Sequence, residues 1–300
     1  MTQTMISVQN VQKSFKKQQV LKGITFEVKS GEIIALLGEN GAGKSTLINI
    51  INKIITPSEG NVTLFDDQYN EGQVKNRTGV MLQNNIIIDR LSVKEVIELS
   101  RSYYKDPLTF EAAMDIAQLD DQADLLMSKL SGGQQRRLSF ALALVGNPDL
   151  IFLDEPTANM DSRARYRLWQ TIAELKQAGK TIIITSHQLA DLEDIATRIF
   201  ILQDGVIAFD GSIDTLRKIQ GEGTIAFRSQ LSMDHFKTIQ PLTNLFQQDH
   251  YYTLITQEVN QVVKQLVPFL DDIQDLSIQQ TPLETLFRHF SREDENHEKH

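Results

Sequence analysis

Residues 38–45 have the types and spacing of a phosphate-binding loop. The segment reads GENGAGKS and fits the pattern G-x-x-x-x-G-K-[ST]. Glycines let successive backbone N–H groups turn toward phosphate oxygens, and the N-terminus of a following helix adds partial positive charge. Lys44 is expected to reach the β- and γ-phosphates of a nucleotide, and Ser45 to hold Mg²⁺. The residues predicted to contact nucleotide in this loop are Gly38, Glu39, Asn40, Gly41, Ala42, Gly43, Lys44, Ser45 and Thr46.

Two adjacent carboxylates supply the second half of such a site. The apolar run Leu150 to Leu153 ends in Asp154 and Glu155, and ligands of open α/β sheets bind at the carboxyl ends of strands. Asp154 is expected to orient Mg²⁺ through its water shell, and Glu155 to polarise the water that attacks the γ-phosphate. By itself an apolar run ending in Asp-Glu is as often an ordinary strand end. Together with the glycine loop it predicts ATP hydrolysis.

A second glycine-rich turn precedes the apolar stretch Leu138 to Val145. Ser131, Gly132 and Gly133 stand there, and such residues form a helix N-terminus that accepts an anion. The same residues also serve as an ordinary helix cap. The residues alone leave both interpretations open.

The segment LSGGQ, from Leu130 to Gln134, resembles the signature of the ABC family of ATPases. Further landmarks of that family stand in order along the chain: Phe15, Gln83, Asp161 and His187. Taken singly, Phe15 also suits a core residue, Gln83 a surface polar group and His187 a capping residue. Their order is what carries the resemblance, which extends over residues 5–215.

The resemblance implies a role for each landmark. Phe15 stacks on adenine, Gln83 and His187 join Lys44 and Glu155 in catalysis, and Gln83 joins Ser45 and Asp154 at Mg²⁺. In the family, the signature of one subunit covers the phosphates held by the other subunit. The resemblance therefore implies a dimer, most simply a homodimer, whose partner-facing ATP contacts are Ser131, Gly132, Gly133, Gln134 and Asp161. Departures such as Glu39 in place of a frequent proline remove no side chain that this chemistry uses.

The elements expected to position these residues form an α/β fold. Residues 33–37, 150–153 and 181–185 are almost wholly apolar and read as buried strands that lead to the glycine loop, the carboxylates and His187. Residues 90–149 read as a helical subdomain, in which Val93, Val96, Ile97 and Leu99 are spaced for one face. The predicted class is a P-loop NTPase cassette of the ABC type, with a mixed β-sheet core, over residues 1–219.

A composition shift at Gly221 and Gly223 predicts a linker and then a small α+β domain over residues 222–290. The order βαββαβ suggests a ferredoxin-like module. Its second helix is expected to bury a stripe at helical spacing, made of Val259, Val262, Val263, Leu266 and Val267. A last helix is predicted over 283–290, after Thr281 and Pro282, and the charged tail 291–300 is expected to be disordered.

Composition limits the functions open to the chain. With 300 residues, 41% hydrophobic and 23% charged, it suits a soluble globular protein. The absence of cysteine excludes disulfides and thiolate metal sites, and the net charge of −9 argues against a protein that coats nucleic acid. No apolar run reaches the roughly 18 residues that span a bilayer, and the N-terminus lacks signal-peptide features. We expect a cytoplasmic protein, peripheral on the inner face of the cell membrane.

Three kinds of ABC protein compete for the function. A DNA-repair type needs a long heptad-rich arm between loop and signature, where fewer than about 100 residues stand, and translation-associated types typically carry two cassettes. A transporter ATPase with a separate membrane permease is favoured. The segment Thr281 to Phe287 resembles the short helix that closes the ATPase subunits of bacterial drug and antibiotic exporters. We expect export of drugs, antibiotics, peptides or lipids, with ATP and Mg²⁺ as cofactors; import remains the alternative.

Overall fold

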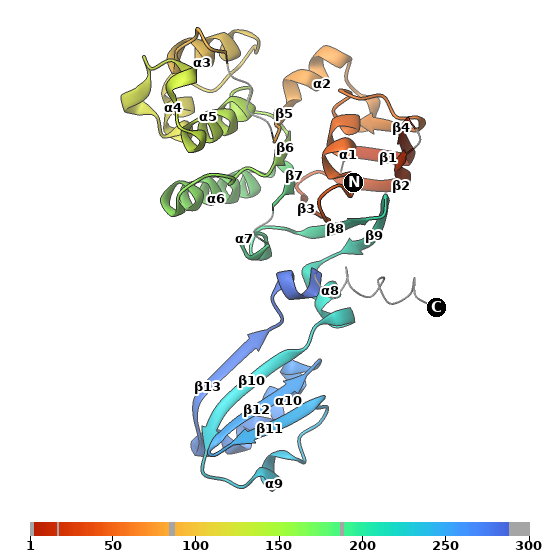
Figure 1. The fold of residues 1–300 in the computed structure, drawn as a ribbon, viewed down its shortest axis with the longest axis vertical. Helices are drawn as coiled ribbons and strands as arrows, with labels where there is room; N and C mark the ends of the chain where they lie inside the picture. The colour runs from red at the N-terminus through yellow and green to blue at the C-terminus, as the bar shows by residue number, and fades with distance from the viewer. Residues whose placement is uncertain (1–2, 17, 84–87, 187–188, 288–300) are drawn as a thin grey trace. The chain divides into compact units, whose positions relative to one another are not determined.

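The chain folds as two units with separate hydrophobic clusters, Met1–Gly211 and Ser212–His300 (Figure 1). The computed structural model describes residues 3–16, 18–83, 88–186 and 189–287. Helix α8 (Ile213–Gln220) groups with the second unit, whereas the sequence predicted a division after residue 219. The contacts of α8 with neighbouring elements assign it to the second unit, and these contacts cannot be read from the sequence.

The first unit is built on a six-stranded sheet in the order β5-β6-β7-β3-β8-β9. Neighbouring strands are parallel except for β8 and β9, which form an antiparallel hairpin. The strands are β3 (Ile33–Leu37), β5 (Thr78–Met81), β6 (Leu150–Asp154), β7 (Thr181–Thr185), β8 (Arg198–Gln203) and β9 (Val206–Gly211). Every residue of β3, β6 and β7 is buried, which confirms the three apolar runs as central strands and explains why they do not alternate with polar residues.

A second, antiparallel sheet of three strands lies in the same unit, in the order β2-β1-β4. Its strands are β1 (Thr4–Phe15), β2 (Gln18–Lys29) and β4 (Glu59–Leu64). One hydrophobic cluster joins this sheet to the larger one and to helix α1 (Lys44–Ile51), with Ile24, Ile34, Leu47 and Phe200 among its members. Both ends of the glycine loop are therefore anchored in one core.

Further helices complete the first unit. They are α2 (Glu71–Arg77), α3 (Val93–Ser102), α4 (Phe110–Ala117), α5 (Gly132–Leu144), α6 (Ser162–Gln177) and α7 (Ala190–Glu193), with 3₁₀ turns at Phe65–Asp67, Asp120–Gln122 and Met127–Lys129. Helices α3, α4 and α5 share their own hydrophobic cluster, as the predicted helical subdomain requires. Val93, Val96 and Ile97 are buried in it, but Leu99 is 40% exposed. The prediction for Leu99 was wrong because, at about 100° of rotation per residue, its side chain lies about 120° around the helix from that of Val93 and so falls beside the buried face.

The second unit contains an antiparallel four-stranded sheet in the order β11-β12-β10-β13. Its elements run β10 (Gly223–Ser229), α9 (Met233–Phe236), β11 (Asn244–Gln248), β12 (Tyr251–Thr256), α10 (Val259–Leu266), a 3₁₀ turn (Val267–Asp272) and β13 (Ile273–Gln280). This is the predicted βαββαβ order. Val262 and Leu266 are buried, whereas Val267 is 57% exposed, because the α-helix ends one residue before it. Residues 283–287 are helical. The rest of the predicted helix, up to 290, and the tail 291–300 lie outside the described residues.

Candidate functional site

The glycine loop connects β3 to α1 and has the backbone that the sequence predicts. Gly41 and Gly43 adopt positive φ angles of 87° and 106°, a region that disfavours other residues. A Cβ on Gly43 would also lie 2.9 Å from the Leu21 side chain on β2. The turn therefore requires glycine here, and α1 begins directly after it, at Lys44.

Lys44 lies across the loop that precedes it. Its Nζ donates to the carbonyl oxygens of Gly38 at 2.8 Å and Glu39 at 3.0 Å. Burial lowers the pKa of Lys44, while the nearby carboxylates of Glu155 and Asp154 favour its charged form. The structure thus brings the lysine of the loop and both strand carboxylates into one electrostatic environment.

A chain of hydrogen bonds joins the loop to the end of β6. Ser45 Oγ donates to Asp154 Oδ2 at 3.0 Å, although 109 positions separate the two residues. The other oxygen, Asp154 Oδ1, accepts from Thr185 Oγ1 at 2.6 Å, at the end of the neighbouring strand β7. Asp154 is only 3% exposed. Both oxygens of this buried carboxylate are therefore held in a fixed direction, as a buried charge requires.

Glu155 follows β6 with a left-handed backbone, at φ 54°. Its N–H donates to Thr185 Oγ1 at 2.9 Å and lies 3.2 Å from the Thr185 carbonyl oxygen. The conformation is sparsely populated for a non-glycine residue, and it turns the chain sharply at the edge of the sheet. Thr185 thus supports both carboxylate residues at once, a role that the sequence did not indicate.

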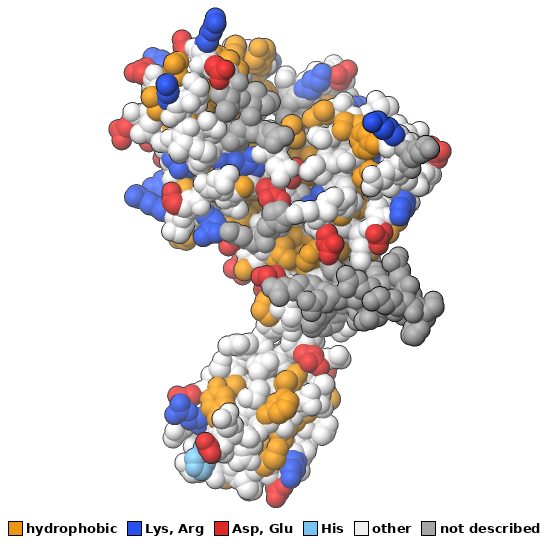
Figure 2. All heavy atoms as spheres, viewed as in Figure 1, with side chains coloured by type: hydrophobic (Ala, Val, Ile, Leu, Met, Phe, Trp, Pro, Cys, Tyr) orange, Lys and Arg blue, Asp and Glu red, His pale blue; other side chains and the backbone are white. Residues whose placement is uncertain are grey.

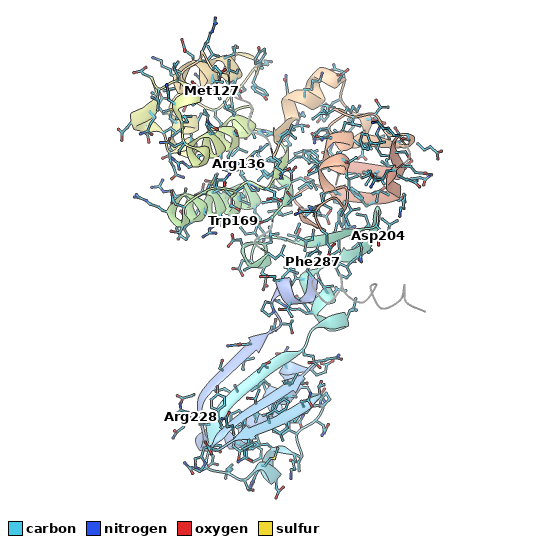
Figure 3. The ribbon with its side chains drawn as sticks, in the orientation of Figure 1. Met127, Arg136, Trp169, Asp204, Arg228 and Phe287 are labelled. Atoms are coloured by element: carbon cyan, nitrogen blue, oxygen red, sulfur yellow. The ribbon has the colours of Figure 1, made fainter. Side chains whose placement is uncertain are left out.

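Gln83 stands just past β5, which pairs with β6 at the edge of the sheet. Its side chain is exposed, and its carbonyl oxygen accepts from Arg136 Nη1 at 2.9 Å. Arg136 also donates to the carbonyl oxygen of Glu155. One guanidinium, that of Arg136 labelled in Figure 3, thus joins the backbones of Gln83 and Glu155.

Phe15 ends β1 and is 45% exposed, and Lys13 Nζ lies 5.1 Å from its ring centroid. Its partner strand β2 passes the glycine loop, because a Cβ on Gly43 would lie 3.1 Å from Val20 of that strand. A partly exposed aromatic residue therefore lies on the hairpin that borders the glycine loop. His187, two residues beyond β7, lies outside the described residues.

The signature residues begin helix α5. Ser131 caps it through a reciprocal capping box with Gln134, at 2.8 and 3.3 Å. Gly133 packs so closely on the loop before α6 that a Cβ would lie 2.8 Å from the Asn159 carbonyl oxygen, whereas Gly132 has no such neighbour. Asp161 caps α6 by accepting from Ala164 N at 2.9 Å. The two loops therefore lie together.

Gln134 and Asp161 also line one polar hollow at the surface, of about 510 Å³. Basic side chains gather over α5 and α6 on the face shown in Figure 2, and the arginines that line the hollow are Arg137, Arg163 and Arg167. The pKa of Asp161 is lowered, first by its bond from the Ala164 N–H. The signature and Asp161 thus share one open, charged surface.

Sequence reasoning missed Thr185 and Arg136. Arg136 lies at helical spacing with the buried residues Phe140 and Leu144, so this stripe was the available signal that its side chain faces inward. Thr185 offered only its place as the last residue of an apolar strand. Its bonds to two carboxylate residues depend on strand order, which the sequence does not specify.

This glycine loop, strand carboxylate and capped signature helix define an ABC-type ATPase cassette, and comparison with known proteins agrees. The sequence model of the family described as "ABC transporter" matches residues 21–158. A Nod factor export ATP-binding protein of Bradyrhizobium diazoefficiens is 33% identical over 72% of this chain and 73% of its own length. The chain belongs to the ABC transporter family: it is a transporter's ATP-binding subunit, and it hydrolyses ATP.

Two further relatives bear on the assembly. A cholesterol transporter of Mus musculus is 30% identical over 89% of this chain, but over only 17% of its own length. A solved dimeric ATP-binding cassette in a post-hydrolysis state, bound to ADP and Pi, is 28% identical, with a TM-score of 0.62 over 70% of this chain and 99% of that one. Within the described ranges, every helix is too short or too polar to cross a bilayer.

Proposed function

We propose that two copies of this chain close around two ATP molecules and power export through a separate membrane permease. The observation that carries the catalytic part is the direct bond from Ser45 Oγ to Asp154 Oδ2, at 3.0 Å. It joins the glycine loop to the strand that ends in Glu155. The side chains that phosphoryl transfer needs are thereby gathered at one edge of the sheet.

Ser45 and Asp154 fit Mg²⁺, because one hydroxyl and one carboxylate oxygen face each other there and Mg²⁺ takes few protein oxygens beside the phosphates of a nucleotide. Gln83 is the third proposed ligand, by family resemblance. The ion would neutralise charge on the β- and γ-phosphate oxygens. Thr185 donates to the other oxygen of Asp154 and so directs the carboxylate toward this position.

Catalytic roles follow from the same cluster. Lys44 exchanges the carbonyl oxygens of Gly38 and Glu39 for phosphate oxygens when ATP binds, since all are acceptors for the same ammonium group. Glu155 orients and deprotonates the attacking water. Gln83 and His187 complete the site around the γ-phosphate, and the ring of Phe15 stacks on adenine. Residues 38–43 and Thr46 bind through the loop and the first turn of α1.

The partner subunit completes each site. Ser131, Gly132, Gly133 and Gln134 cover the nucleotide held by the other copy, and Asp161 meets the partner across the interface. Support comes from Gly132, where an added Cβ would meet no atom within 4 Å, and from the solved relative that is a dimer. ATP then favours the closed dimer because it contacts both halves, and hydrolysis releases it.

A Glu155→Gln variant tests the catalytic assignment. It should bind ATP, form a stable dimer that can be seen by size-exclusion chromatography, and lose turnover, because the amide cannot accept the proton of the attacking water. Glu71→Gln is the matched control, since Glu71 is exposed on α2 and pairs only with Lys75 in the described contacts. Turnover of Glu155→Gln at the wild-type rate would exclude Glu155 as the base.

Export rests on two supports. The relative of Bradyrhizobium diazoefficiens is named for export, and the segment 281–287 resembles the short helix that closes exporter ATPases. The match to a cholesterol transporter covers 89% of this chain, more than the first unit alone, so it extends into the second unit. We place the subunit on the inner face of the membrane, bound to its permease.

Transport direction is tested on membranes that contain the subunit with its co-purified permease. In inside-out vesicles the ATP site faces the medium, so added ATP should drive an exporter to accumulate substrate inside. Candidate drugs and fluorescent lipids serve as probes, with the Glu155→Gln subunit as control. ATP-driven loss of preloaded substrate from such vesicles would show an importer instead.

A further inference from the structure

Arg136 is a buried cation for which the proposed ATP contacts provide no role. It is the fifth residue of α5 and is 2% exposed. Burial lowers its pKa, while the carboxylates of Asp154 and Glu155 favour the charged form. A buried charge is costly unless its donors are satisfied, so the bonds that it makes explain why the fold tolerates it.

Those bonds go to backbone carbonyl oxygens at the ends of two adjacent strands. Nη1 donates to Leu82 O at 2.8 Å and to Gln83 O at 2.9 Å, just past β5. Nε and Nη2 donate to Glu155 O at 3.1 and 2.7 Å, just past β6, and Nη2 also donates to Asp154 O. The β5–β6 ladder runs as far as Met81 and Leu153. Arg136 therefore binds the carbonyl groups where this ladder ends, which need partners when buried.

The peptide groups on both sides of Glu155 are thereby held. Thr185 accepts from the N–H of Glu155 on one side, and Arg136 donates to its carbonyl oxygen on the other. The left-handed φ of 54° at Glu155 is unfavourable unless the surroundings hold it. The direction of the Glu155 side chain thus depends on the guanidinium, and so does the backbone of Gln83.

The same arginine belongs to the helix that carries the signature. Ser131 caps α5 five residues before Arg136, a distance of about 7.5 Å along the axis at 1.5 Å per residue. Because a helix moves as a rigid segment over so short a length, a shift of Ser131 and Gly133 also shifts the guanidinium. The end of α5 that faces a partner's nucleotide is thus mechanically joined to Gln83 and Glu155 of its own chain.

We propose that Arg136 is a positioning residue for ATP hydrolysis, which holds the backbones of Gln83 and Glu155 in the arrangement that the reaction requires and ties that arrangement to helix α5. The inference rests on the proposed roles of those two residues. Its consequence is specific: loss of the guanidinium slows the chemical step, while ATP binding through the glycine loop is retained.

Lysine is the informative replacement. Arg136→Lys keeps the positive charge and the length, but a single ammonium cannot span carbonyl oxygens on two strands as a planar guanidinium does. Arg136→Gln is a second variant, which removes the charge and keeps an amide donor. The matched control is Arg101→Lys, because Arg101 Nε likewise donates to a carbonyl oxygen, Leu108 O at 2.8 Å, within the helical region.

The experiment measures kcat, KM, the Kd for ATP and the unfolding midpoint of each variant. Arg136→Lys should remain folded and bind ATP within about twofold of the wild type, with kcat lowered on the order of 10- to 100-fold, the range expected for displaced catalytic groups. Arg101→Lys should keep the wild-type kcat. If Arg136→Lys does not fold, Arg136→Gln decides by the same comparison. A Glu155→Gln, Arg136→Lys double variant should still form the ATP-dependent dimer.

Three results would overturn the inference. They are a wild-type kcat for Arg136→Lys, a fall in kcat that only follows a loss of ATP affinity or of folded protein, and loss of the ATP-dependent dimer in the double variant. Failure of the proposed function looks different, because Glu155→Gln then turns over like the wild type whatever Arg136→Lys does. Normal turnover of Arg136→Lys beside an inactive Glu155→Gln refutes this inference alone.

Discussion

Thr185 holds the two carboxylate residues of the site, so its replacement by valine tests the geometry directly. Thr185→Val keeps the shape of a buried side chain that is fully enclosed, but it removes the donor to Asp154 Oδ1 at 2.6 Å and an acceptor for the Glu155 N–H at 2.9 Å. A hydrogen bond to a charged group contributes about 1.5–3 kcal/mol. The Glu155 N–H also approaches the Thr185 carbonyl oxygen, so the carboxylate bond accounts for most of the effect.

The expected loss follows from that bond. If loss of this bond raises the activation free energy by the full free energy of the bond, kcat/KM falls about 10- to 150-fold, at 1.36 kcal/mol per tenfold. A loss of about 2 kcal/mol would lower the unfolding midpoint by about 4–8 °C in a unit of this size. Steady-state ATPase assays and thermal unfolding measure the two quantities separately.

Thr185→Ser is the matched control, because it keeps the hydroxyl group and removes one methyl, which lowers stability by about 1 kcal/mol. Its ATPase activity should stay near the wild type once folded protein is counted. The reasoning is refuted if Thr185→Val and Thr185→Ser hydrolyse ATP at rates within twofold of each other.

Further predictions concern binding, closure and acid stability. Phe15→Ala should raise KM for ATP about 5- to 100-fold, the range of one base–aromatic stack, and an unchanged KM would remove Phe15 from the site. Gly133→Ala should lower the unfolding midpoint, since its Cβ would lie 2.8 Å from Asn159 O, whereas Gly132→Ala should not; equal midpoints for the two variants would contradict this packing. Hydrogen bonds from the backbone and side chain of Ser92 hold the pKa of Glu95 below its ordinary value. The stability that the Glu95 carboxylate contributes is therefore present above pH 4.5 and lost as pH falls through the pKa of the folded state. Wild type and Glu95→Gln should therefore converge in unfolding midpoint as pH is lowered below 4.5, and a constant difference would argue against this pH dependence.

The glycine loop and the signature cap could be predicted because each is local. A turn that needs positive φ at Gly41 and Gly43, or a serine that accepts from an N–H three residues on, involves contiguous residues. The βαββαβ order of the second unit could be read in the same way, from short apolar runs separated by turns. Spacing was less reliable at helix ends, where Val267 falls beyond the last α-helical residue.

The tertiary structure alone decided how these pieces meet. Ser45 and Asp154 are 109 positions apart and bond only because β6 and β3 lie on the two sides of β7 in one sheet. Thr185 and Arg136 act at the site through the order of strands and the packing of α5, and neither follows from local sequence. The sequence therefore determined the motifs of a few residues that carry the chemistry, since backbone turns and caps are set by near neighbours. The tertiary structure determined which residues position those motifs, because a buried carboxylate or guanidinium finds its hydrogen-bond partners only when distant strands come together.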